Sequence, residues 1–194
     1  MNSLIHYTYV FYFPAVWIAY SIYWWAMSRG VKANERIEPG ASRLLRLVLM
    51  LTSIALLALP DFPLSPLNLR FVPLAAWPFW AGAAVTAAGI LFSVWARRHL
   101  GSNWSRAVTI KQDHELITTG PYALVRHPIY TGLLLALLGS AIARGEWRGL
   151  LAVLLVFVAF YLKIRLEESW MRLRFGLSYE AYSRRVAALI PYLF

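Results

Sequence analysis

The chain contains no cysteine and few charged residues, and each shortage excludes a class of protein. Without cysteine there are no disulfides, no thiol nucleophile and no cysteine-ligated zinc or iron–sulfur site. Charged residues make up 14% of the 194 residues and hydrophobic residues 60%, whereas soluble domains average about 25% and about 45–50%. The composition is therefore that of an integral membrane protein, and the mean hydropathy of +0.55 agrees with it.

Five apolar segments approach the length of a membrane-spanning helix, which needs about 20 mostly apolar residues. The last two are short and are separated only by the tetrapeptide RGEW, so we expect a helical hairpin that need not cross the bilayer fully. The third contains the stretch AGAAVTAAG, whose small residues let a neighbouring helix approach closely. The sequence thus predicts an all-α integral membrane protein of about five transmembrane helices, over roughly 8–28, 44–60, 73–96, 129–143 and 147–166.

The basic residues predict how the chain is oriented. Sixteen of the 19 Lys and Arg residues lie in three segments, 29–46, 97–126 and 163–185. The alternate loops hold only Arg70, Arg144 and Arg148. By the positive-inside rule the N-terminus is outside, and the basic segments and the C-terminus are cytoplasmic. This pattern accounts for most of the net charge of +10, so the expected partner of the basic residues is the membrane and not a nucleic acid.

Ionisable residues at two helix ends form the candidate functional site. Arg126 and His127 precede the fourth apolar segment, and Glu167 and Glu168 follow the fifth. An antiparallel hairpin would place these ends side by side, across one cytoplasmic cleft. Pro128 would stand in the first turn of its helix, where it costs no backbone hydrogen bond, and would fix His127 at the entrance. The alternative is that the charged side chains only reach the membrane–water interface.

The C-terminal half resembles the isoprenylcysteine carboxyl methyltransferase family, which is related to the phospholipid N-methyltransferases. The resemblance covers roughly 95–194 and rests on three motifs in combination: GPYALVRHPIYTG, LEES and FGLSYEAYSRRVAALIPYLF. It implies a membrane methyltransferase that uses S-adenosyl-L-methionine, held by a cytoplasmic C-terminal segment. Residues 1–96 would form the first three transmembrane helices, and 97–194 the methyltransferase core of cofactor loop, hairpin and C-terminal helix.

The same resemblance assigns roles to single residues. The catalytic residues would be Arg126, Arg165 and Glu168, with no metal ligand. The substrate-facing arginine of the family falls near Lys163 or Arg165, and the alignment leaves both open. Ala187 stands where many members have proline. The cofactor-binding residues would be His114, Glu115, Leu116, Ile117, Tyr122, His127, Pro128, Ile129, Tyr130 and Glu167.

The chemistry of the acceptor stays open at this point. A carboxylate acceptor needs only a cation such as Arg165 to orient it, whereas an amine must lose a proton to a base, for which Glu168 or His127 are candidates. Arg126, or the amides of 127–129, could meet a carboxylate of the cofactor; Arg126 could equally contact the acceptor or lipid headgroups.

We expect a lipophilic acceptor from the bilayer, with O-methylation of an isoprenylcysteine-like carboxylate favoured and phospholipid N-methylation as the alternative. Two alternative functions come from other classes of protein. An NADPH-dependent membrane reductase would bind the reduced dinucleotide instead of the methyl donor. A non-enzymatic membrane scaffold would leave the clustering of His127 with Glu167 and Glu168 unexplained.

Overall fold

The computed structural model describes residues 3–28, 40–59, 63, 65–101 and 116–191. Apart from one isolated β-bridge, these residues form helices and loops only. Two short 3-10 helices, η1 (Ser65–Asn68) and η3 (Gly120–Ala123), lie in the connections. The α-helices are α1 (Ser3–Met27), α2 (Gly40–Ala58), α3 (Ala76–Leu100), α4 (Pro128–Arg144), α5 (Trp147–Phe175) and α6 (Leu177–Arg185).

All five predicted segments form helices. Among the residues that the structure describes, three helices, α2, α3 and α5, are long and apolar enough to cross a membrane. The expectation of short hairpin helices holds for α4, with 17 residues, and is wrong for α5, with 29. After Gly149, in its first turn, α5 contains no proline or glycine before Gly176, which ends the helix with a positive φ of 51°. Helix α5 is therefore about 43 Å long, against a hydrocarbon core of about 30 Å, and Glu167 and Glu168 lie within its last three turns.

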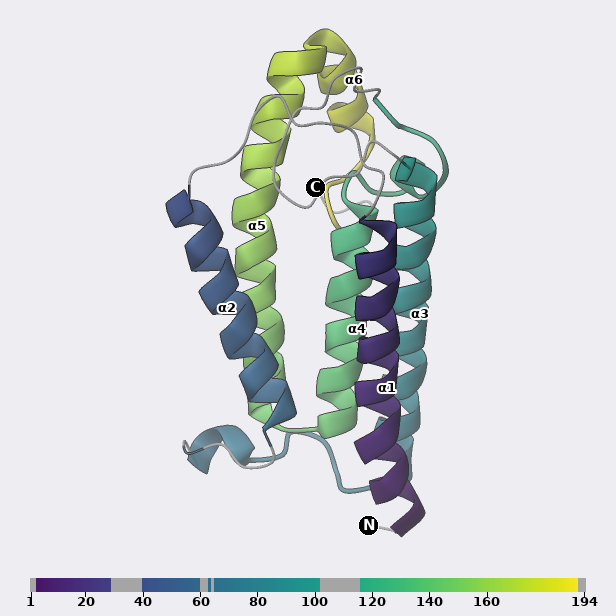
Figure 1. Cartoon of the computed structure of the whole chain (residues 1–194), viewed down its shortest axis with the longest axis vertical. Helices are drawn as coiled ribbons and strands as arrows, with labels where there is room; N and C mark the ends of the chain where they lie inside the picture. The colour runs from purple at the N-terminus through teal and green to yellow at the C-terminus, as the bar shows by residue number, and fades with distance from the viewer. Residues whose placement is uncertain (1–2, 29–39, 60–62, 64, 102–115, 192–194) are drawn as a thin grey trace.

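The helices form two groups that meet at the α4–α5 hairpin (Figure 1). In the first, α3 and α4 make the most extensive contact of the described residues, and α1 packs against α3. In the second, α2 packs along α5. The N-terminus of α1 and helix α6 lie at opposite ends of the molecule (Figure 1). The placement of the N-terminus outside and of the C-terminus in the cytoplasm stays a prediction.

Glycine residues allow the close approach of α3 and α4. Gly82 faces Gly139, and Gly89 faces Gly132, with backbone against backbone. A Cβ atom added at Gly89 would lie 2.5 Å from the Gly132 carbonyl oxygen and 2.5 Å from the Ala136 nitrogen. The expected role of the AGAAVTAAG stretch as a close helix contact is thus confirmed.

At the end opposite α6, one glutamate holds two arginines against the end of α2. The Glu146 carboxylate accepts from Arg144 (3.2 Å) and from Arg148 (2.5 Å). Both guanidinium groups also donate to backbone carbonyls where α2 ends, Arg144 to Leu57 (2.7 Å) and Arg148 to Leu59 (2.8 Å). Arg144 and Arg148, which the sequence placed in a loop, therefore fix α2 to the hairpin. They bind backbone carbonyls at the end of α2 that have no partner within the helix.

Replacing Gly89 by alanine should lower the stability of the protein by about 1–3 kcal/mol, because the added methyl group meets backbone atoms of α4. Gly40→Ala is the matched control, since nothing lies within 4 Å of a Cβ atom at Gly40. Thermal unfolding of the detergent-solubilised variants measures the difference. Equal melting temperatures for Gly89→Ala and Gly40→Ala would contradict the close packing of α3 on α4.

Candidate active site

The start of α4 is built as the sequence predicts. His127 is the N-cap residue and Pro128 the first residue of the helix. Gly120 turns the preceding loop with a positive φ of 59°, and Pro128 is buried. The backbone N–H of Thr131 donates to the His127 carbonyl (3.0 Å), which closes the first turn. Pro128 and the helix therefore hold the imidazole of His127 at a fixed place beside α5.

Glu167 is the more accessible of the two adjacent acids on α5. The Tyr130 hydroxyl donates to Glu167 Oε1 (2.7 Å). His127 Nδ1 lies 3.6 Å from Glu167 Oε2, and Lys163 Nζ lies 3.8 Å from Oε1. The Glu167 side chain remains 23% exposed. It is thus a carboxylate, oriented from two helices, that still has surface available to a ligand.

Glu168, by contrast, is enclosed by basic side chains. Its Oε1 accepts from Arg126 Nε (2.8 Å) and lies 3.2 Å from His127 Nε2. Its Oε2 lies 3.2 Å from Arg172 Nη2, and the side chain is 9% exposed. Charge-assisted contacts of this kind are stronger than neutral ones. Glu168 therefore acts as the link between the start of α4 and α5, a geometry that does not favour the general-base role considered for it.

Arg126 extends this link to the C-terminal residues 183–191, which we call the C-terminal strap. Its guanidinium donates to the carbonyls of Ser183 (3.0 Å) and Val186 (2.5 Å). The backbone N–H groups of Arg126 and of the next residue donate to the carbonyls of Ala187 (2.8 Å) and Ala188 (3.0 Å). Both of these amides thus bind the strap, and the guanidinium binds the strap and Glu168. These contacts join the start of α4 to the strap, and the catalytic role of Arg126 stays a prediction.

Tyr122 packs between the end of α3 and the start of α4. Its side chain is 7% exposed and belongs to a cluster with Ala96 and Ile129. The hydroxyl of Tyr182 donates to the Tyr122 carbonyl (2.6 Å); burial raises the pKa of Tyr182 to about 12, so this donor keeps its proton. The ring of His99 stacks on Tyr122, with centroids 6.3 Å apart. His99, at the end of α3, is an exposed aromatic group that the sequence motifs did not single out.

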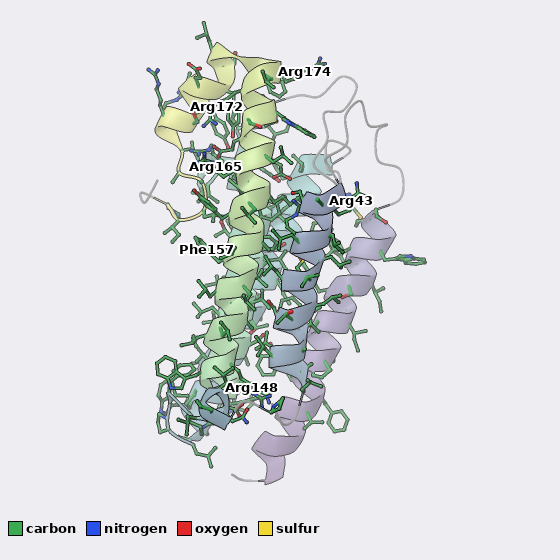
Figure 2. The ribbon with its side chains drawn as sticks, turned by 90° about the vertical axis from the view of Figure 1, so that its left-hand side faces the viewer. Arg43, Arg148, Phe157, Arg165, Arg172 and Arg174 are labelled. Carbon is green, nitrogen blue, oxygen red and sulfur yellow. The ribbon has the colours of Figure 1, made fainter. Side chains whose placement is uncertain are left out.

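The structure distinguishes Lys163 from Arg165, the two candidates for the substrate-facing cation of the family. Lys163 lies one turn before Glu167 and 5.3 Å from the centroid of the Tyr130 ring. Arg165 is exposed and lies 3.5 Å from the hydroxyl of Tyr161, on the outer face of α5 (Figure 2). Because a helix turns about 100° per residue, two residues that are two apart face different sides. Lys163 therefore lies beside Glu167, whereas Arg165 lies on another face of α5; the catalytic role of Arg165 stays a prediction.

The remaining predicted cofactor contacts lie at the edge of the described loop. Leu116 and Ile117 are half-buried, and Ile117 packs against the cluster that contains Tyr122. His114 and Glu115 lie outside the described residues. The structure therefore gathers the predicted residues from Leu116 onward, except Arg165, around the start of α4 and the last turns of α5.

Two buried arginines in the N-terminal half escaped the sequence motifs. Arg97 of α3 is 2% exposed and donates to the carbonyls of Met27 and Gly101, which ties the ends of α1 and α3 together. Arg46 of α2 is 7% exposed and donates to Ser42 Oγ (2.8 Å). In the sequence, both arginines count only toward the orientation of the chain in the membrane, by the positive-inside rule. The spacing of Arg46 from Ser42, four residues, places two polar groups on one helix face and could have indicated an inward side chain.

Replacing Arg126 by methionine should loosen the C-terminal strap, because a buried partner of Glu168 and two carbonyl contacts are lost. The amides that donate to Ala187 and Ala188 should exchange their hydrogens at least about tenfold faster, from a loss of roughly 1.5–3 kcal/mol. Hydrogen exchange read by mass spectrometry on the peptide around residue 126 measures this. Arg184→Met, at an exposed position of α6, is the control; equal exchange in the two variants would contradict the assigned role.

Comparison with known proteins places this site in context. A model of the phospholipid methyltransferase family matches residues 77–178. The protein-S-isoprenylcysteine O-methyltransferase of Schizosaccharomyces pombe is 38% identical over 94 residues, which is 47% of this chain and 40% of that protein. A probable protein-S-isoprenylcysteine O-methyltransferase of Oryza sativa subsp. indica is 33% identical over 96 residues, covering 48% and 50%.

The solved structures give a matching fold. The structure of the eukaryotic intramembrane Ras methyltransferase ICMT (isoprenylcysteine carboxyl methyltransferase) has a TM-score of 0.57 and 25% identity, over 79% of this chain and 52% of that one. The chain thus spans about half, or less, of the length of the relatives that it matches. The family match contains His127 and Glu167 and leaves α1 and α2 outside.

Proposed function

The chain belongs to the phospholipid methyltransferase family, and on that premise we propose that it is a membrane enzyme that transfers a methyl group from S-adenosyl-L-methionine to the carboxylate of a lipophilic, isoprenylcysteine-like acceptor. The observation that carries this proposal is the meeting of His127 and Tyr130, at the start of α4, with Glu167 of α5. The names of the two sequence relatives and of the similar structure support a carboxyl acceptor.

The residues of the site fit a donor that carries a sulfonium, an ammonium and a carboxylate. Glu167, partly exposed and held by Tyr130, would accept hydrogen bonds from the ammonium or the ribose hydroxyls. Leu116, Ile117 and His99 would contact the adenosine end beside Tyr122. When bound, the donor supplies an electrophilic methyl group; the protein lowers the barrier by aligning the acceptor with it and by keeping water out.

The geometry favours a carboxylate acceptor over an amine. An amine must give up a proton to a base as it is methylated. Both oxygens of Glu168 already face basic side chains. Both ring nitrogens of His127 face a carboxylate oxygen, one of Glu167 and one of Glu168. Both candidate bases are thus occupied by contacts within the protein, whereas an acceptor carboxylate needs no base. Phospholipid N-methylation is the second candidate, and the description of the matching family, phospholipid methyltransferase, supports it.

The proposal extends to topology and domain roles. The N-terminus would lie outside, with the site on the cytoplasmic face; residues 97–194 would form the transferase core and 1–96 the N-terminal membrane helices. Acceptors would enter from the bilayer. The distribution of charge supports this orientation: Arg148 lies near the opposite end from the labelled arginines at the α6 end, which are Arg43, Arg165, Arg172 and Arg174 (Figure 2).

Methylation of a lipid extract with labelled donor tests the function. Membranes that contain the protein should transfer label to an added S-prenylated cysteine, as an ester that alkali hydrolyses. His127→Ala should reduce the rate about 100-fold or more, because the residue orients the site. Arg174→Gln, an exposed change at the end of α5, is the control that keeps the rate. Alkali-stable label on an ethanolamine phospholipid would favour N-methylation, and no transfer at all would reject the proposal.

A further inference from the structure

His99 extends from a well-packed helix end. It is an exposed residue in the last turn of α3. On the inner face of the same turn, Ala96 is fully buried and Arg97 is 2% exposed. The backbone N–H of Gly101 donates to the Arg97 carbonyl and ends the helix. The packing of α3 therefore fixes the backbone from which the imidazole projects.

The imidazole of His99 contacts three of the four residues 119–122, which we call the η3 turn. Its Nε2 lies 2.9 Å from Thr119 Oγ1, within hydrogen-bond distance. Its ring stacks on the ring of Tyr122 with an angle of 24° between the planes. A Cβ atom added at Gly120 would lie 2.8 Å from His99 Cε1. The ring therefore lies directly against the backbone of the turn, at a position where glycine leaves the room.

The η3 turn is in contact with the candidate site. Tyr122 belongs to one buried cluster with Ile129 of α4, and the ring of Tyr130 packs against that cluster. The Tyr130 hydroxyl donates to Glu167 (2.7 Å). These four residues are all expected ligands of the methyl donor. Printed contacts therefore lead without a gap from the imidazole of His99, through the turn, to the carboxylate of the site.

Contacts from two helices hold the η3 turn. The hydroxyl of Tyr182, in α6, donates to the Tyr122 carbonyl (2.6 Å), and His99 contacts the turn from α3. One neutral hydrogen bond adds little to the stability of a whole protein. The local opening of a short segment, however, depends on the few contacts that this segment makes. We therefore expect the loss of the His99 contacts to change the turn and not the melting temperature.

We propose that His99 is a positioning residue for the methyl donor: its contacts with Thr119 and Tyr122 hold the η3 turn in the conformation that binds S-adenosyl-L-methionine. This assignment rests on the proposed function. The apparent dissociation constant of a ligand rises in proportion as the competent conformation becomes less populated. Loss of the His99 contacts should therefore weaken donor binding, while the transfer step at saturating donor keeps its rate.

Two substitutions remove the same hydrogen bond from opposite sides. His99→Phe keeps a ring that can stack on Tyr122 and loses the bond to Thr119. Thr119→Val loses the bond at a residue that is not an expected donor contact. Calorimetry on the purified protein in nanodiscs should show the Kd of S-adenosyl-L-methionine raised about three- to tenfold by each change. The double variant should be little worse than the worse single one. Arg98→Gln, at the exposed neighbouring position of α3, is the matched control and should bind like the wild type.

Hydrogen exchange of the donor-free protein gives a second measurement, independent of any ligand. The backbone N–H of Tyr122 donates to the Thr119 carbonyl (3.1 Å), and that of Val125 to the Pro121 carbonyl (3.3 Å). In His99→Phe and in Thr119→Val, the peptide that contains these amides should exchange about three- to tenfold faster than in the wild type. The melting temperature should match that of the wild type. His99→Gln, which retains a hydrogen-bonding side chain, should recover part of the protection.

Donor binding by Thr119→Val that equals the wild type would overturn the proposal, even if His99→Phe binds more weakly, because the imidazole would then act only by touching the donor. A lower rate at saturating donor with an unchanged Kd, measured with an S-prenylated N-acetylcysteine as acceptor, would overturn it as well. If His99→Phe does not fold, Thr119→Val decides. Failure of the wild type to bind the donor would reject the proposed function, whereas equal exchange in the donor-free variants would reject only the role of His99.

Discussion

The ion pair between Arg126 and Glu168 is the contact on which the rest of the candidate site depends. Arg126 binds both the carboxylate and the carbonyls of the C-terminal strap, and Glu168 also faces His127. One buried pair therefore joins the start of α4, the last turns of α5 and the end of the chain. Removing Arg126 costs roughly 1.5–3 kcal/mol, because its charged hydrogen bonds are lost while His127 and Arg172 still face Glu168. The two adjacent acids consequently have different tasks.

Because Glu168 is committed to this link, Glu167 is the acid that can meet a ligand. Tyr130 fixes one of its oxygens, and Lys163 and His127 lie beside it. The hairpin supplies all four groups, which agrees with a family match that contains the whole hairpin. Helix α2 lies outside that match and packs along α5.

Much of the fold was predictable, since apolar length and small residues decide where membrane helices form and touch. The meeting of His127 with Glu167 and Glu168 followed from an antiparallel hairpin with a short turn, and the family resemblance is confirmed by the comparisons. The extent of α5 was missed, because charged residues past 166 do not end a helix when no glycine or proline intervenes. The rotation of about 100° per residue separates Lys163 from Arg165, and it could have been applied to the sequence. The burial of Arg46 depends on how α2 packs against its neighbours, and the four-residue spacing from Ser42 is a weak local signal of it.

Donor binding in a double-mutant cycle is the most direct test of the central claim, that His127 and Glu167 form one site for S-adenosyl-L-methionine. Calorimetry in detergent on the wild type, His127→Ala, Glu167→Ala and the double variant gives the four dissociation constants. We expect each single change to weaken binding about tenfold or more, and the double change to do little more than the worse single one, with a coupling of about 0.5–3 kcal/mol. Undiminished binding in both single variants, or strictly additive losses, would contradict a shared site.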